Sequence, residues 1–261
     1  MLVLLSPAKS LDWSPVPPTL PASDPSLGKD MGVLMRVMKR KSALDLSRLM
    51  HLSDNLATLN RDRYQAMTGT PDSERGRPAA LAFNGDVYQG LDARSLTEAD
   101  LTWAQDHLAI LSGLYGVLRP LDTIEPYRLE MGTKLKTRRG AHLYAFWDDR
   151  VTRLLNRWLK EQNADVVVNL ASKEYARVVK RKGLKARMVT PLFKEIDRGK
   201  AQTIGFFAKR ARGMMARFIV EGRHTHPEAL KGFDGGGYRF DPALSDADTW
   251  TFTRPKPPPV K

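Results

Sequence analysis

The sequence has no cysteine and only five histidines among its 261 residues. Without thiols, the chain has no disulfide, no Cys-ligated zinc or iron–sulfur site and no thiol redox sensor of its own. The histidines are scattered except for His224 and His226, and that pair lacks a third ligand at a typical spacing. We therefore expect no metal site and no cofactor, while carboxylate ligation of iron stays open as an alternative.

Long apolar runs are also missing. No stretch approaches the roughly 20 apolar residues that a membrane-spanning helix requires. The N-terminus, Met1 to Leu5, has no basic segment before its apolar run and stops at Ser6-Pro7, which argues against a signal peptide. We interpret this run as a buried first strand and expect a cytoplasmic protein that does not contact a membrane.

Acidic residues are scarce relative to basic ones. The chain carries 42 Lys and Arg against 29 Asp and Glu, which gives a net charge of +13 and an isoelectric point near 10.0. This excess favours a polyanionic partner: nucleic acid, an anionic membrane or phosphorylated small molecules. Charge alone does not choose among these three classes.

The order of apolar segments predicts an α/β protein. Helical patterns cover residues 27–66 and 97–107, and short apolar runs at residues 1–5, 79–83 and 165–170 predict buried strands. We expect a mixed central sheet surrounded by helices. Repeats and long linkers are absent, so residues 1–254 are predicted to form one large domain, with residues 255–261 as a disordered tail.

Polar residues follow each of the three predicted strands. Ser6 and Lys9 follow the first, Asp86 follows the second, and Ser172, Lys173 and Glu174 follow the third. If the strands are parallel and adjacent, these residues converge on one crevice at the carboxyl edge of the sheet, where α/β proteins bind ligands. The alternatives stay open: Asn84-Gly85 is also a turn signal, and Ser172 is also a typical helix N-cap.

The segment from residue 108 to 132 joins an apolar run to a glycine turn and then to arginines. Gly113 and Gly116 permit a sharp turn whose backbone N–H groups could contact a phosphate, as in a helix-hairpin-helix. Prolines at positions 120 and 126 stiffen the presentation of Arg119 and Arg128, and Lys134 and Lys136 follow. The alternative is a structural turn with its arginines in surface salt bridges.

Two further segments are strongly basic. One contains Arg177, Lys180, Arg181 and Lys182. After predicted strands at residues 188–196 and 202–207, a helix begins near Lys209 and can line a cleft with four cations: Lys209, Arg210, Arg212 and Arg217. Arginine binds phosphate with a bidentate geometry, although a solvated helix face would carry the same residues.

Five segments resemble the YaaA family of bacterial peroxide-stress proteins. They occur in the family's order and are LLSPAKSLD (4–12), AFNGDVYQGL (82–91), SGLYGVLRPLDTIEPYRLEMG (112–132), NLASKEY (169–175) and KRARGMMARFI (209–219). The resemblance implies a cytoplasmic DNA-binding protein with a role in protection against hydrogen peroxide. It also implies a mixed α/β fold with a helix-hairpin-helix element and a positively charged cleft.

Two functions follow from these observations. The first is binding of DNA, as duplex or repair intermediates, mainly through the phosphate backbone and with little sequence specificity, to protect DNA or assist its repair. No helix carries the Asn, Gln and Arg pattern that reads base edges. The alternative is an enzyme that acts on a nucleotide or nucleic acid through the Lys, Ser and Glu residues of the crevice. The sequence leaves the oligomeric state open.

Overall fold

The computed structural model describes residues 1–16, 20–71 and 74–258. At its centre, β1 (Leu2–Leu5) lies between β5 (Leu108–Ser112) and β8 (Val166–Asn169) and is parallel to both. Next to β8 come β9 (Arg187–Asp197) and β12 (Thr249–Pro255), also parallel. The antiparallel strands are β6 (Gly116–Leu118), β10 (Lys200–Gln202) and β11 (Arg239–Asp241). The predicted α/β class with a mixed sheet is confirmed.

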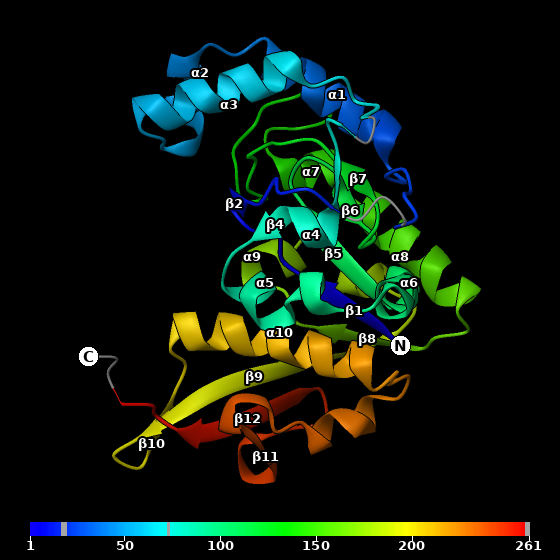
Figure 1. Cartoon of the computed structure of the whole chain (residues 1–261), viewed down its shortest axis with the longest axis vertical. Coiled ribbons are helices and arrows are strands. Elements are labelled where there is room, and N and C mark those ends of the chain that lie inside the picture. Colours follow the sequence, from blue (N-terminus) through cyan, green and yellow to red (C-terminus); the bar gives the residue numbers. More distant parts are fainter. Residues whose placement is uncertain (17–19, 72–73, 259–261) are drawn as a thin grey trace.

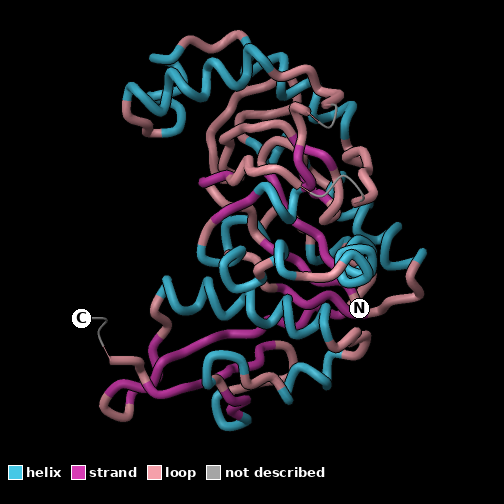
Figure 2. The backbone as a smooth tube through the Cα atoms, in the orientation of Figure 1, coloured by secondary structure: helices cyan, strands magenta, loops and turns pink. Residues whose placement is uncertain are grey.

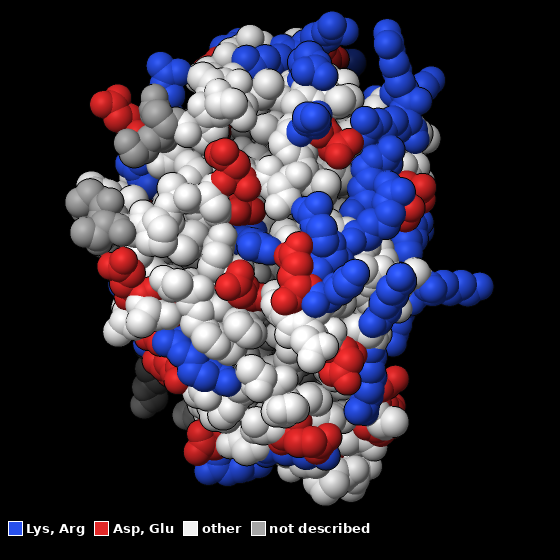
Figure 3. All heavy atoms as spheres, turned by 90° about the vertical axis from the view of Figure 1, so that its right-hand side faces the viewer, with Lys and Arg blue, Asp and Glu red and all other residues white. Residues whose placement is uncertain are grey.

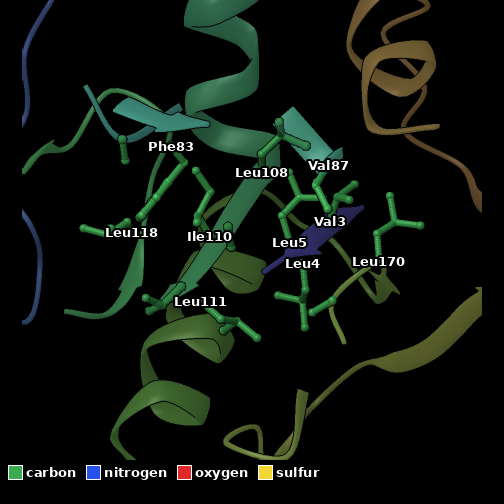
Figure 4. Packing of buried hydrophobic residues seen from close by; sticks show 14 of the residues in the cluster. Val3, Leu4, Leu5, Phe83, Val87, Leu108, Ile110, Leu111, Leu118 and Leu170 are labelled. Atoms are coloured by element: carbon green, nitrogen blue, oxygen red, sulfur yellow. The ribbon is translucent and has the colours of Figure 1, made fainter. Parts of the chain in front are cut away.

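The core is built around β1. Each of its four residues is at most 1% exposed. Strands of a parallel sheet are covered on both faces, which is why β1 is an uninterrupted apolar run. In Figure 4, Val3, Leu4 and Leu5 lie among side chains from neighbouring elements, including Ile110 and Leu170. The carboxyl end of β1 is therefore fixed within the sheet.

Helices cover the sheet along its length (Figure 1). The longest is α10 (Gly205–Glu221), which lies across β9 and packs on α5 (Asp86–Leu91). The other helices of this region are α6 (Glu98–His107), α7 (Leu143–Trp147), α8 (Arg150–Glu161) and α9 (Lys173–Ala176). Short 3₁₀ turns lie in connections between helices and strands of this region: η1 (Ala93–Ser95), η2 (Arg181–Gly183), η3 (Pro227–Gly232), η4 (Gly235–Gly237) and η5 (Pro242–Leu244).

One end of the molecule is helical, and β9 and β12 lie at the other (Figure 1). The helical end comprises α1 (Gly28–Lys39), α2 (Ala43–Met50) and α3 (Asp54–Ala66), as the sequence pattern predicts. Met31, Leu34 and Met38 form the buried stripe of α1. Between this end and the sheet the chain is mostly loop (Figure 2), and residues 125–142 form no helix or strand.

Two of the predicted strands are wrong. Residues 79–82 form the short helix α4 (Ala79–Ala82), because this alanine-rich segment is a better helix former than strand former. Only β4 (Phe83–Asn84) follows it, and β4 pairs with β2 (Ser10–Leu11) outside the main sheet. The predicted strand at 202–207 stops at Gln202, since Gly205 to Phe207 already belong to the amphipathic pattern of α10. A last small ladder pairs β3 (Arg77–Pro78) with β7 (Thr123–Ile124).

The glycine turn is not a helix-hairpin-helix. It joins the antiparallel strands β5 and β6, with Ser112 opposite Gly116. Gly113 and Gly116 are buried, and the Trp147 indole N–H donates to the Gly113 carbonyl at 3.0 Å. A Cβ on Gly113 would lie 2.2 Å from the Leu129 carbonyl oxygen. These glycines therefore allow close packing in the core, and their backbone does not face a phosphate at the surface.

The C-terminal segment is ordered further than predicted. Pro255 ends β12, and the Lys256 ammonium lies 2.7 Å from an Asp197 carboxylate oxygen. The rest of the predicted tail includes residues 259–261, which lie outside the described residues. Among the described residues, no helix combines the length and apolar character needed to cross a membrane.

Candidate functional site

The loops that follow β1 and β8 meet at the carboxyl edge of the sheet. Leu4 pairs with Asn169, so the two strands end side by side. Just beyond them, the Ser172 backbone N–H donates to Ser6 Oγ at 2.8 Å. This bond joins residues that are 166 positions apart and fixes the floor of a crevice. The predicted convergence of the first and third strand ends is observed.

Helix α5 closes a second side of the crevice. The Tyr88 hydroxyl donates to the Ser6 carbonyl oxygen at 3.0 Å, and both groups are buried. Burial raises the pKa of Tyr88 well above its usual value, so this hydroxyl stays protonated as a donor. Asp86, at the start of α5, thereby lines the crevice although no strand of the main sheet precedes it.

The crevice is a hollow of about 490 Å³. Its charged lining residues come from the loop after β1, from α5, from the irregular segment 125–142, from α9 and from α10: Lys9, Asp86, Glu130, Glu174, Lys209 and Arg212. Hydroxyl and amide groups line it too: Ser6, Ser10, Asn84, Ser172 and Tyr175. This size and this mixture of polar and apolar groups are typical of small-molecule sites.

Ion pairs organise the lining. The Lys9 ammonium lies 2.9 Å from one carboxylate oxygen of Glu130, and the Arg128 guanidinium lies 3.5 Å from the other. On the opposite side, the Lys209 ammonium lies 3.6 Å from Asp86. The Glu174 carboxylate accepts the Gly132 backbone N–H at 2.8 Å. Two of the lining cations, Lys9 and Lys209, are thus paired with lining carboxylates.

Ser172 is the N-cap of α9, because its hydroxyl accepts a hydrogen bond from the Tyr175 N–H. This is the alternative role that the sequence left open for Ser172. It also lines the crevice, so the two interpretations are compatible. Lys173, which the sequence groups with these residues, is an exposed residue of α9 and does not line the hollow. Glu130 and Tyr175 are lining residues that sequence reasoning missed. Glu130 lies in a segment without periodicity, and no pattern could have placed it there.

A basic surface adjoins the crevice through α9. Seven exposed cations surround α7 and form what we call the α7 basic surface: Lys134, Lys136, Arg138, Arg177, Lys180, Arg181 and Lys182. Within the described residues, only Lys180 of this set has an ion-pair partner, Asp148 at 3.8 Å. The Arg177 guanidinium lies over the Tyr144 ring at 4.7 Å. Most of these charges therefore face solvent without a neutralising carboxylate.

Contacts with α7 and α8 explain how these residues gather. The Leu143 N–H of α7 contacts the Thr133 carbonyl at 3.5 Å, which places the 133–138 segment beside this helix. Buried Thr133 and Leu135 alternate there with exposed Lys134 and Lys136. The Lys180 N–H donates to Thr152 Oγ1 of α8 at 2.8 Å. Figure 3 views the side on which α8 lies, and Lys and Arg form a band along one edge of it, with Asp and Glu beside them.

Some predicted phosphate ligands already form contacts with other residues of the fold. Arg119 lies 3.5 Å from Asp106 and 3.4 Å from Glu161, and it covers the Trp158 ring at 4.7 Å. Of the four predicted phosphate ligands of α10, Arg217 is likewise held by several contacts within the fold. Lys209 and Arg212 line the crevice and Arg210 is exposed.

Arg217 joins α10 to the end of α5. Its guanidinium donates to the carbonyls of Leu91 and Asp92 at 3.2 and 3.0 Å. It also pairs with Glu221 at 2.8 Å. These bonds satisfy orphan carbonyls at the C-terminus of α5, so the structure gives this arginine a packing role.

Comparison with known proteins identifies the family. A model described as peroxide stress protein YaaA matches residues 1–244. The chain belongs to the YaaA family. It is 53% identical over 257 residues to a UPF0246 protein of Caulobacter vibrioides, covering 98% of this chain and 100% of that protein. A UPF0246 protein of Phenylobacterium zucineum is 52% identical over 259 residues, with 99% and 97% coverage.

The YaaA family description names peroxide stress, and the names of these relatives assign no activity. Among the described residues, no group of three His, Asp or Glu side chains lies close enough together to hold a metal ion. The chemistry open to this member of the YaaA family is therefore best judged from its crevice and its α7 basic surface.

Proposed function

We propose that this protein binds DNA through the phosphate backbone as part of the response to peroxide stress. The observation that carries the proposal is the α7 basic surface, because six of its seven cations have no ion-pair partner among the described residues. Closely spaced cations bind a polyanion by releasing its counterions. DNA in bacteria lies in the cytoplasm, so we place the activity there.

The arrangement of the surface favours backbone contact over base reading. Lys134, Lys136 and Arg138 come from an irregular segment, and Arg177 to Lys182 come from the end of α9 and the loop after it. Neither segment is a long helix that fits a major groove. Binding should therefore show little sequence specificity, and protection or assisted repair of DNA fits such binding better than control of a particular promoter.

The test is binding to a labelled duplex at increasing salt concentrations. Replacing Lys134, Lys136 and Arg138 with Gln should weaken binding and reduce the slope of log K against log salt by about 0.9 for each phosphate that the variant no longer neutralises. Two duplexes of unrelated sequence should give the same result.

The control removes three cations from the end of the molecule at which β9 and β12 lie (Figure 1): Lys200, Lys231, which pairs with Glu228, and Arg239, which pairs with Asp234. It changes the net charge equally and should leave most of the slope in place. Equal losses of affinity in both triple variants would mean that only net charge matters, and the α7 basic surface would then not be the DNA site.

An enzyme acting on a nucleotide or nucleic acid is the alternative function. It is favoured by the two Lys–carboxylate pairs in the crevice, Lys9 with Glu130 and Lys209 with Asp86. Incubating the protein with nucleotides and oligonucleotides and analysing the products tests it. Turnover that Glu130→Gln abolishes, with duplex binding unchanged, would support this alternative.

A further inference from the structure

Arg212 is the one crevice-lining cation that has no hydrogen bond or ion pair with any described residue. It lies on α10 between buried Ala211 and Gly213 and is itself half-buried. Burial lowers the pKa of Arg212 because the surroundings solvate its charge poorly. A partly desolvated guanidinium without a partner is costly, and an anion is the group that would relieve this cost.

The carboxylates of the crevice do not fill this role. Glu130 is held between Lys9 and Arg128, and Asp86 faces Lys209. Glu174 accepts a backbone N–H from Gly132. Each acid thus has its own partner, which leaves the positive charge of Arg212 available to a ligand.

Two hydroxyl groups that line the crevice are also free to donate a hydrogen bond. Ser6 Oγ accepts from the Ser172 N–H, and Ser172 Oγ accepts from the Tyr175 N–H. Neither hydroxyl donates its own hydrogen to a described residue. Hydroxyls and a guanidinium around one cavity are the donors that a phosphate requires.

We propose that the crevice is a binding site for a phosphomonoester of nucleotide size, with Arg212 holding the phosphate. A volume of about 490 Å³ exceeds what inorganic phosphate would fill. The carboxylates of Glu130 and Glu174 remain acceptors for sugar hydroxyl or base amino groups, and Pro7, Ala8 and Val87 supply apolar surface. This site is separate from the α7 basic surface and does not depend on duplex binding.

The same chemistry has two sources: a free mononucleotide, or the 5′-phosphorylated end of a DNA strand. Calorimetric titration of the full chain with dAMP, deoxyadenosine and inorganic phosphate tests the site itself. We expect dAMP to bind, and the nucleoside and inorganic phosphate each to bind at least about tenfold more weakly, since each lacks one half of the contacts. Single-stranded oligonucleotides with and without a 5′-phosphate then distinguish the two sources.

Arg212→Gln should weaken dAMP binding by about 10- to 100-fold, the value of a charged hydrogen-bonded contact. Because this change removes a partly desolvated charge that has no partner among the described residues, it should leave the melting temperature equal or slightly higher. Arg210→Gln is the matched control: it lies on the same helix, is exposed and does not line the crevice, so dAMP affinity should stay the same.

The proposal is overturned if no nucleotide binds at millimolar concentration, if deoxyadenosine binds as well as dAMP, or if both arginine variants lose affinity equally. Duplex binding measured on the same variants separates this site from the proposed function. Arg212→Gln should keep the duplex salt slope, and the triple variant of the α7 basic surface should keep dAMP binding. The proposal of a nucleotide site in the crevice and the proposal of a duplex site on the α7 basic surface can therefore each be refuted without the other.

Discussion

Gly213 of α10 lies directly against Val87 of α5, so that a Cβ on Gly213 would sit 1.8 Å from the Val87 carbonyl oxygen. Gly90 on α5 makes the reciprocal approach, with the Arg210 carbonyl 2.1 Å from its virtual Cβ. The two helices therefore touch backbone to backbone. This contact brings Asp86 and Lys209 together on one side of the crevice, where the ammonium lies 3.6 Å from the carboxylate.

Gly213→Ala should therefore destabilise the protein. The added methyl group cannot fit unless α5 and α10 separate, and such overpacking typically costs about 1–3 kcal/mol or more. We expect a lower midpoint in urea denaturation. Gly205→Ala is the control from the same helix, because its Cβ would have no neighbour within 4 Å and stability should be unchanged or slightly higher. Equal effects of the two variants would contradict this account of the crossing.

Replacing Glu195 should lower the free energy of unfolding. It is fully buried, accepts from the Ile204 N–H at 3.2 Å and the Tyr238 hydroxyl, and lies 3.5 Å from the Arg254 guanidinium. Glu195→Ala would leave the Arg254 side chain, which is only 14% exposed, without its countercharge, at a cost of about 3 kcal/mol. Glu195→Gln retains the shape and one acceptor and should cost less. A loss below about 1 kcal/mol for the Ala variant in urea denaturation would contradict the importance of this pair.

The sequence predicts features that depend on local pattern. The strand after Met1 and the strand ending at Asn169 are both found, because a short apolar run bounded by polar or turn-forming residues is typical of a buried strand. Their neighbouring ends also bring Ser6 to Ser172 as predicted. The short helix at Ala79–Ala82 was missed because a run of four apolar residues shows no period, and the helix propensity of its alanines was the only signal against a strand.

Features that depend on tertiary partners could not be predicted. Arg212 and Arg217 look equivalent in the sequence, since both are cations of the same helix. In the fold, Arg217 meets the carbonyls at the end of α5, whereas Arg212 faces the crevice without a partner among the described residues. Glu130 is similar, because only the path of an irregular segment brings it to Lys9.

Thr97 and Ser53 provide a paired test of helix capping. Ser53 and Thr97 are the N-cap residues of α3 and α6, yet only Thr97 forms reciprocal bonds, with Asp100, at 3.1 Å in each direction between side chain and backbone. Ser53 makes no side-chain cap bond. Thr97→Ala should therefore lower the free energy of unfolding by about 1 kcal/mol, and Ser53→Ala by only a few tenths. Equal losses in thermal or urea denaturation would mean that the capping bond contributes nothing.

Asp122 should make stability depend on pH in a defined window. It is 1% exposed, and burial raises its pKa from 3.8 to about 6, although hydrogen bonds from the Arg119 N–H and the Ser23 hydroxyl oppose that rise. Well below pH 3.8 the carboxyl is neutral in both the folded and unfolded states. Between pH 4 and 6 the unfolded state ionises first, so the free energy of unfolding falls as pH rises, by about 3 kcal/mol in total for this group.

Asp122→Asn removes this titration. Its amide disturbs one of the two accepted hydrogen bonds and so changes stability by an amount that does not vary with pH. Every other titrating group is shared with the natural protein and cancels in the difference. The stability of the variant relative to the natural protein should therefore increase by roughly 2 kcal/mol between pH 4 and pH 7, as measured by urea denaturation at each pH. A difference that stays flat across this range would mean that Asp122 ionises in the fold as readily as in the unfolded chain.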